Sequence, residues 1–249
     1  MELSNKKEYS IFQKILLNPI FLFLIVASSM WSVWDITKSE SSEELLMKKA
    51  NELAQKFIIT DGHIDVPWRL HKGGYEDLSV RTPGGDFDYV RATEGGLDVP
   101  FMSIYVPATY QVTGGAKAMA EELIGMVERI TTDHPDKFEI AYNVSDADRI
   151  VSEGKIALPM GMENGAPIEG DLKNIEYFHN KGISYITLTH SKDNAICDSS
   201  YDTTGTHQGL SSFGAEVVTE MNRVGVMVDI SHVSDNAFYQ VMDITKVPA

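Results

Sequence analysis

Histidines and carboxylates that could hold a metal ion follow apolar runs of the chain at four places. They are His63 with Asp65, then Glu163, His190 and His232. Imidazole and carboxylate together suit a borderline metal such as Zn²⁺, which can activate water for hydrolysis. The chain has a single cysteine, Cys197, so a thiolate zinc cluster and an intrachain disulfide are both excluded.

Each of these signals is weak by itself. A tripeptide of the type His63-Ile64-Asp65 often arises by chance, and a lone glutamate after a strand is more often a charge at a helix N-terminus. The coincidence at four strand ends favours one shared site, because the carboxyl ends of parallel strands converge on one mouth of a barrel. The alternation of side chains along a strand also aims His63 and Asp65 to the same side.

The elements that must position these residues form a strand–helix alternation from about Ser41 onward. Apolar runs predict strands at 57–60, 97–106, 156–162, 183–189 and 224–230. Helical periodicity predicts helices at 43–56, 115–131, 172–180, 213–223 and from 236 onward. Repeated strand–helix units of this length imply parallel strands joined by crossovers, so we expect an α/β fold without a second domain.

The first forty residues differ from this body. Residues 15–34 carry no charge and follow Lys6, Lys7 and Lys14, a pattern typical of an export signal or of an uncleaved signal anchor. Residues 1–40 are therefore predicted to be a hydrophobic leader helix with a short linker. We expect an exported protein, either periplasmic or extracellular, or one associated with the membrane through residues 15–34.

The charge balance narrows the classes of partner. Lysine and arginine total 21 against 36 aspartates and glutamates, which gives a net charge of −15. A surface of this sign repels phosphate backbones, so nucleic acid is not an expected partner.

Five stretches of the chain resemble the membrane (renal) dipeptidases, metallopeptidase family M19. They are DGHIDVPW (61–68), GGLDVPFMSIYVP (95–107), GMENGAPI (161–168), NKGISYITLTHSKDN (180–194) and GLSSFGAEVVTEMNRVGVMVDISHVS (209–234). They occur in the order and spacing of the family. The resemblance extends from about Ala50 to Ala249, and its final stretch is the most specific.

This resemblance implies a TIM-type (β/α)8 barrel in which two Zn²⁺ ions serve the hydrolysis of dipeptides. By position, His63 and Asp65 would ligate the first zinc, Glu163 would bridge both ions, and His232 would ligate the second. His190 matches the histidine that contacts the substrate carbonyl, so Glu163 and His190 are the expected catalytic residues. The resemblance also makes a homodimer an expectation.

The chain departs from the family pattern in two ways. Many members have glycine where Asn164 follows Glu163, and since Glu163 itself is present we expect the bridge to be kept. The family's other second-zinc histidine, its substrate-binding arginine and its proton-transfer aspartate would all fall beyond Ala249. With five predicted strands where a barrel has eight, we expect residues 41–249 to be the N-terminal part of the barrel and inactive alone.

Two alternative functions stay open from the sequence. One is a short homologue that binds metal or peptide without turnover, which a metal count and a test of chelator-sensitive hydrolysis would distinguish from an enzyme. The other is a different amidohydrolase-type barrel hydrolase. Such enzymes tend to have H-x-H on the first strand, whereas this chain has His63-Ile64-Asp65.

Overall fold

The computed structural model of the chain describes residues 41–249. The chain divides into two compact units, one up to Glu52 and one from Leu53 to Ala249. Helix α3 (Ser42–Ala54) accounts for most of what is described of the first unit. The predicted export signal or anchor at 15–34 lies outside the described residues. Within residues 41–249, no helix combines the length and apolar character needed to cross a bilayer.

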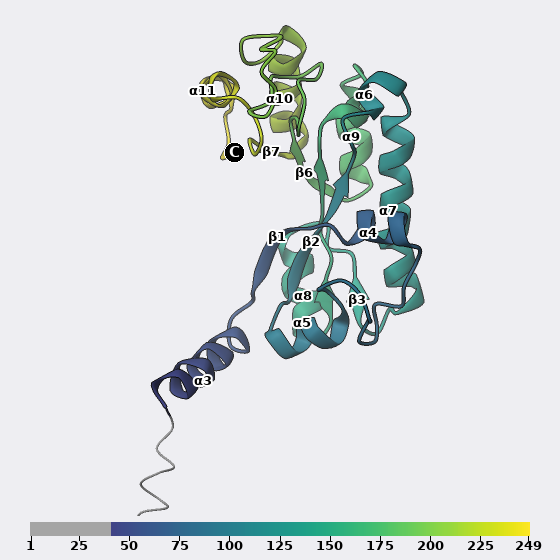
Figure 1. The fold of residues 1–249 in the computed structure, drawn as a ribbon, viewed down its shortest axis with the longest axis vertical. Helices are drawn as coiled ribbons and strands as arrows, with labels where there is room; N and C mark the ends of the chain where they lie inside the picture. Colours follow the sequence, from purple (N-terminus) through teal and green to yellow (C-terminus); the bar gives the residue numbers. More distant parts are fainter. Residues whose placement is uncertain (1–40) are drawn as a thin grey trace, which may run out of the picture. The chain divides into compact units, whose positions relative to one another are not determined.

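The second unit is built on a five-stranded parallel sheet (Figure 1). Its strands, in spatial order, are β1 (Thr60–Ile64), β2 (Val99–Tyr105), β5 (Met160–Glu163), β6 (Ile183–Thr187) and β7 (Met227–Asp229). Spatial order follows chain order, so the sheet winds in one direction, as the wall of a β/α barrel does. This confirms the predicted α/β fold with a parallel, half-barrel sheet. A small second sheet pairs β3 (Phe138–Glu139) with β4 (Ile156–Ala157).

Helices fill the connections between the strands, and a last helix follows β7. They are α4 (Val66–Gly73), α5 (Tyr89–Gly95), α6 (Tyr110–Thr113), α7 (Ala116–Asp133), α8 (Val144–Ser152), the 3-10 turn η1 (Ala166–Ile168), α9 (Lys173–Asn180), α10 (Ser212–Val224) and α11 (Asp235–Ile244). The bounds of α7, α9 and α10 lie within two residues of those predicted from periodicity. Helices α4, α5 and α8, each of nine residues or fewer, were not predicted from the sequence.

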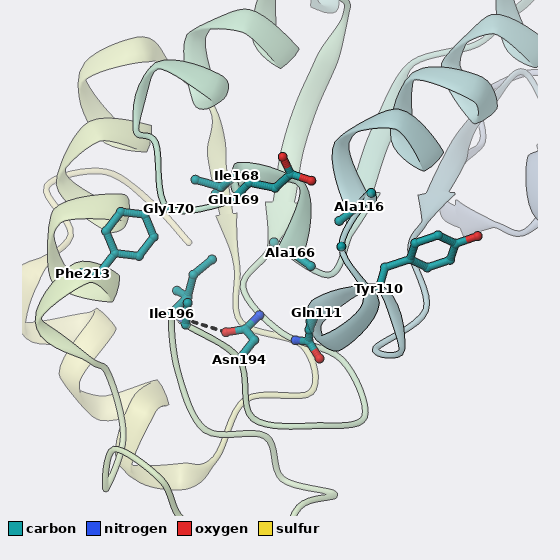
Figure 2. A pocket seen from close by; sticks show the side chains of 14 residues that line it. Tyr110, Gln111, Ala116, Ala166, Ile168, Glu169, Gly170, Asn194, Ile196 and Phe213 are labelled. Atoms are coloured by element: carbon teal, nitrogen blue, oxygen red, sulfur yellow. Dashed lines mark hydrogen bonds between the residues drawn. The ribbon is translucent and has the colours of Figure 1, made fainter.

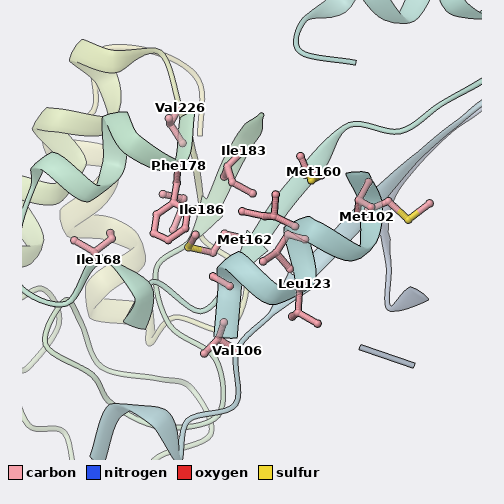
Figure 3. Close-up of a cluster of buried hydrophobic side chains, with 14 of the residues drawn as sticks. Met102, Val106, Leu123, Met160, Met162, Ile168, Phe178, Ile183, Ile186 and Val226 are labelled. Atoms are coloured by element: carbon pink, nitrogen blue, oxygen red, sulfur yellow. The ribbon is translucent and has the colours of Figure 1, made fainter. Parts of the chain in front are cut away.

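The hydrophobic core lies between the sheet and its helices (Figure 3). Met102 on β2, with Met160 and Met162 on β5, is fully buried there against Leu123 of α7 and Phe178 of α9. Side chains alternate along a strand, so the residues next to these methionines on β2 and β5 point to the opposite face of the sheet. We call this opposite face the inner face.

Two layers of residues on that inner face follow from the strand register. Ser103, Gly161 and Tyr185 are partners across β2, β5 and β6. Tyr105, Glu163 and Thr187 are partners one layer nearer the carboxyl ends of the strands. The inner face is therefore polar where the core face is apolar, and it is the face that presents Glu163.

The first predicted strand was wrong in its bounds. The apolar run 57–60 predicted a strand, but β1 begins at Thr60, and Phe57, Ile58 and Ile59 are exposed. Backbone pairing decides the start, because Thr60 is the residue in register with Val99 of β2. As a result His63 lies inside β1 rather than after it.

The third predicted strand, 156–162, is divided in two. Ile156 and Ala157 form β4 in the small sheet, and β5 begins at Met160. Pro159 lies between them and has no N–H to donate to a continuous ladder. Because of this interruption, consecutive residues of the chain form β4 in the small sheet and β5 in the large sheet.

Candidate metal centre

Glu163 ends β5 on the inner face, and its side chain is only 9% exposed. Its two carboxylate oxygens face different imidazoles. Oε2 lies 3.4 Å from Nε2 of His63, whereas Oε1 lies 3.2 Å from Nε2 of His232 and 3.5 Å from Nε2 of His190. One carboxylate therefore connects two separate groups of potential ligands.

These contacts make two overlapping triads. In the first, one ligand atom each from His63, Asp65 and Glu163 lies within 4.8 Å of the other two, and the same holds for Glu163, His190 and His232 in the second. Nε2 of His63 is 3.5 Å from Oδ1 of Asp65, so both side chains do point to the same side. The structure thus brings together all five residues that the sequence singled out, from β1, β5 and the segments that follow β6 and β7.

The donor set fits a metal ion. Among residues 41–249, the ion-pair partners of the Glu163 carboxylate are the three imidazoles, and no lysine or arginine approaches it. A buried carboxylate with no lysine or arginine beside it is costly unless another cation binds. Imidazole nitrogens with carboxylate oxygens are ligands that Zn²⁺ accepts.

The environment shifts the pKa values of three members of the cluster. The Asp65 carboxylate raises the pKa of His63, and the contact with His63 lowers the pKa of Asp65 in turn. Burial lowers the pKa of His190, which favours its neutral form.

The two nitrogens of His190 have different surroundings. Nδ1 is buried and finds no hydrogen-bond partner within the described part of the chain. A buried N–H without an acceptor is rarer in proteins than an under-satisfied acceptor, so we assign the proton to Nε2. His190 then directs an N–H donor toward Oε1 of Glu163 and the centre of the cluster.

His232 follows β7 in a backbone conformation that is uncommon for a residue other than glycine, with φ of 68°. Its carbonyl oxygen accepts hydrogen bonds from the backbone N–H of Ser200 at 2.8 Å and from the hydroxyl of Ser200 at 3.1 Å. The segment after His190 therefore holds His232 in place from outside β7.

Two aspartates, Asp193 and Asp198, organise that segment. Asp198 is buried and accepts the backbone N–H groups of His207 and Gly209, each at 2.8 Å. Asp193 accepts those of Ser199 and Thr206. Their carboxylates are occupied by backbone donors, so they shape the loop and do not join the cluster.

Asn164 follows Glu163, and its side chain is fixed by hydrogen bonds outside the cluster. Its backbone conformation explains why asparagine can replace the glycine that many family members have at this position. Its φ of 79° is left-handed, a region that glycine adopts freely and that asparagine tolerates better than other residues. The side chain is buried and donates from Nδ2 to the carbonyl of Val106 at 2.8 Å. Oδ1 accepts the Ala166 N–H and an Asn194 amide N–H, each at 3.2 Å.

Two substitutions of Asn164 separate the contribution of its backbone conformation from that of its side-chain hydrogen bonds. Asn164→Gly keeps the left-handed backbone but loses the buried hydrogen bonds, so we expect the free energy of unfolding to fall by about 1–2 kcal/mol. Asn164→Ala adds backbone strain of about 1 kcal/mol to that loss. Urea unfolding of the two variants checks the order, and an alanine variant as stable as the glycine variant would contradict it.

A cavity in the described region lies away from the cluster (Figure 2). It has a volume of about 400 Å³ and lies among η1, the start of α7 and the start of α10, where Gln111, Ile168, Ile196 and Phe213 line it. None of the five cluster residues lines this cavity. The cavity is therefore not part of the candidate metal centre.

The four remaining histidines stay outside the cluster. Nδ1 of His71 lies 2.8 Å from Glu122, and Nε2 of His134 lies 3.0 Å from Asp77. His207 donates from Nε2 to the backbone carbonyl of Asn194, and His179 lies in the last turn of α9. Sequence reasoning did miss Tyr185, whose hydroxyl lies 3.3 Å from Nδ1 of His63. No local pattern marks it, because the two residues lie 122 positions apart.

Relatives with similar sequences are dipeptidases. Dipeptidase tcpJ of Claviceps purpurea is 31% identical over 202 residues, which cover 76% of this chain and 47% of that protein. Dipeptidase 3 of Mus musculus is 30% identical over 217 residues, which cover 83% of this chain and 43% of that protein. The chain spans about half the length of the curated relatives it matches.

Solved structures agree with the fold. The probable dipeptidase PvdM from Pseudomonas aeruginosa superposes with a TM-score of 0.73 at 27% identity, over 81% of this chain and 53% of that one. A metallo peptidase from Rhodobacter sphaeroides, liganded with a phosphinate mimic of the dipeptide L-Ala-D-Ala, gives a TM-score of 0.68 at 22% identity, over 77% of this chain and 63% of that one. The second likeness shows the fold alone.

The family assignment rests on a match over most of the chain. The family model described as membrane dipeptidase (peptidase family M19) matches residues 47–249. This range includes the whole sheet and all five residues of the cluster. The chain belongs to the membrane dipeptidase family, peptidase family M19.

Proposed function

We propose that this chain carries the metal centre of a zinc-dependent dipeptidase, an enzyme that hydrolyses the peptide bond of dipeptides. One observation carries the proposal: the two oxygens of the buried Glu163 carboxylate face separate imidazoles, one in each triad. Relatives at 30–31% identity that bear the name dipeptidase support the reaction class.

Different residues of the chain would hold the two zinc ions. His63 and Asp65 would hold the first zinc, His232 the second, and Glu163 would bridge the two. When bound, two zinc ions would supply a Lewis acid for the peptide carbonyl and a water of lowered pKa. The negative charge of Glu163 would offset the charge of both ions.

His190 would act on the substrate instead of on a metal. Its Nε2–H faces the centre of the cluster, and its ring is held edge-on against Tyr105, with centroids 5.0 Å apart. A preorganised N–H donor of this kind stabilises a carbonyl oxygen as negative charge develops on it. Burial favours the neutral imidazole, in which Nε2 keeps its proton while Nδ1 stays unprotonated.

Turnover is assigned to the whole protein and metal binding to the residues described. The chain matches about half of each relative's length, 47% of one and 43% of the other. We therefore propose zinc binding for the residues described and dipeptide hydrolysis for the whole protein.

Zinc is expected to stabilise chelator-treated protein. A ligand that binds only the folded state at 100 times its Kd adds about 2.7 kcal/mol to the free energy of unfolding. Urea unfolding with and without added Zn²⁺ measures this gain, and elemental analysis gives the number of ions bound. An unchanged unfolding midpoint with no bound metal would contradict the metal centre.

Hydrolysis of L-Ala-D-Ala and L-Ala-L-Ala, with and without EDTA, tests the reaction. Chelator-sensitive release of free alanine together with two zinc ions per chain supports a dipeptidase. Two bound zinc ions without hydrolysis, in a protein extended to the full length of the family, would favour a metal- or peptide-binding homologue and overturn the enzymatic proposal.

A further inference from the structure

His190 and His232 lie beyond the ladder that joins β6 to β7, whose last register pair is Thr187 with Asp229. The sheet therefore does not fix the two histidines directly. Their imidazoles nevertheless face the same oxygen: both Nε2 atoms lie within 3.5 Å of Oε1 of Glu163, and the ring centroids are 4.6 Å apart. Groups outside the sheet must hold the two rings this close together.

Two consecutive residues, Ser199 and Ser200, bind the backbone carbonyls of these histidines. The Ser199 hydroxyl donates to the carbonyl oxygen of His190 at 2.5 Å. Ser200 donates to the carbonyl oxygen of His232 from its backbone N–H, at 2.8 Å, and from its hydroxyl, at 3.1 Å. Adjacent Cα atoms are about 3.8 Å apart, so one peptide unit holds both carbonyls. We call these two residues the serine pair.

The serine pair is itself fixed from two directions. Ser199 is only 2% exposed, and its backbone N–H donates to Oδ1 of Asp193 at 2.8 Å. It also forms an antiparallel bridge with Val233. Next to it, the carbonyl oxygen of Asp198 accepts the backbone N–H of Ser234 at 2.9 Å. Buried and hydrogen-bonded polar groups of this kind are held rigidly, so the carbonyls that the serine pair binds are held with it.

We infer that Ser199 and Ser200 are positioning residues: by holding the two backbone carbonyls, they set the separation of the His190 and His232 imidazoles at Oε1 of Glu163. Active sites depend on this kind of support, because a misplacement of about 1 Å can impair them. The effect on zinc rests on the proposed function, whereas the arrangement of the two rings does not.

Nuclear Overhauser effects between the two rings test the arrangement in metal-free protein. At about pH 9, where imidazoles are neutral, ring protons of His190 and His232 should show a mutual effect, because the rings meet edge-on. In Ser199→Ala the carbonyl of His190 loses its donor, so the effect should be lost in protein that is still folded. A role in stability alone would lower the unfolding midpoint and leave the effect unchanged.

Ser152→Ala is the matched control, because that hydroxyl also donates to a backbone carbonyl, that of Arg149 in α8 at 2.6 Å. It should leave the effect between the rings unchanged. Ser200→Ala keeps the backbone N–H that binds His232, so we expect a smaller loss than in Ser199→Ala. Ser199→Cys places a weak donor in nearly the same volume, and it takes the place of the alanine variant if that variant does not fold.

Zinc affinity provides the second readout. Groups that orient metal ligands typically contribute about 10–100-fold to affinity, so we expect Ser199→Ala to weaken zinc binding at the second triad by about tenfold. Zinc at the first triad should bind as in wild-type protein. Within residues 41–249, the side-chain hydrogen bonds of the serine pair go to His190 and His232 and to the Tyr201 N–H, not to His63 or Asp65.

The outcomes separate this inference from the proposed function. No effect between the rings in wild-type protein, or an unchanged effect in folded Ser199→Ala or Ser199→Cys, would overturn the inference. Absence of zinc binding in wild-type protein, with the effect present and lost in Ser199→Ala, would count against the proposed function and leave the positioning role standing.

Discussion

Replacing Glu163 by glutamine is expected to abolish tight zinc binding. Removing one partner from a buried charged group costs about 4 kcal/mol, which corresponds to a loss of about 1,000-fold in affinity. Both triads contain Glu163, so the loss should affect both ions. Equilibrium dialysis against a zinc buffer series measures the two dissociation constants.

The same substitution should leave the metal-free fold intact. An amide of nearly the same shape replaces a carboxylate whose partners here are three imidazoles, so unfolding in EDTA should change by less than about 1 kcal/mol. Glu169→Gln is the matched control, because that side chain accepts the Lys117 N–H at the start of α7, outside the cluster. Two tightly bound zinc ions in Glu163→Gln would show that Glu163 does not bridge.

Gly214→Ala is expected to be the most destabilising small substitution in the helices. A Cβ atom on Gly214, in α10, would lie 2.1 Å from the backbone oxygen of Ile196, which has no freedom to move aside as a side-chain tip would. Overpacking of this kind costs about 3 kcal/mol. Because Ile196 belongs to the loop between His190 and Ser200, the clash should also weaken zinc binding in the second triad.

Gly125→Ala gives the matched control for helix propensity. Gly125 lies within α7, and no atom comes within 4 Å of a Cβ placed there. Alanine should therefore stabilise the protein by about 1 kcal/mol, the ordinary gain over glycine inside a helix. Urea unfolding of the two variants should give changes of opposite sign. Equal effects would contradict the close approach of α10 to the Ile196 backbone.

The fold was predictable from the sequence where the signal is local and long. Helix α7 shows a helical period over five turns, and its bounds follow from that period. The run Phe57–Ile59 misled the prediction, since apolar character does not tell whether a segment has a partner strand. The register between Thr60 and Val99, which joins residues 39 positions apart (99 − 60), decided the start of β1 instead.

The cluster was predictable as a set of residues but not as an arrangement. His63, Glu163, His190 and His232 each follow or end an apolar run, and parallel strands place such ends at one edge of a sheet. Nothing local in the sequence says that the two oxygens of Glu163 face different imidazoles. That division depends on how far β1, β6 and β7 lie from β5 in space.

By itself the sequence determined the family, the strand–helix alternation and the identity of the five polar residues, because motifs and periodicity are properties of neighbouring positions. Only the tertiary structure decided which nitrogen of each histidine faces the cluster. His63 has the Tyr185 hydroxyl on Nδ1, and His190 has no partner there among the described residues. The physical reason is that the orientation of a ring depends on groups brought to it from distant positions of the chain. For His63 one such group is the Tyr185 hydroxyl on β6, 122 positions away.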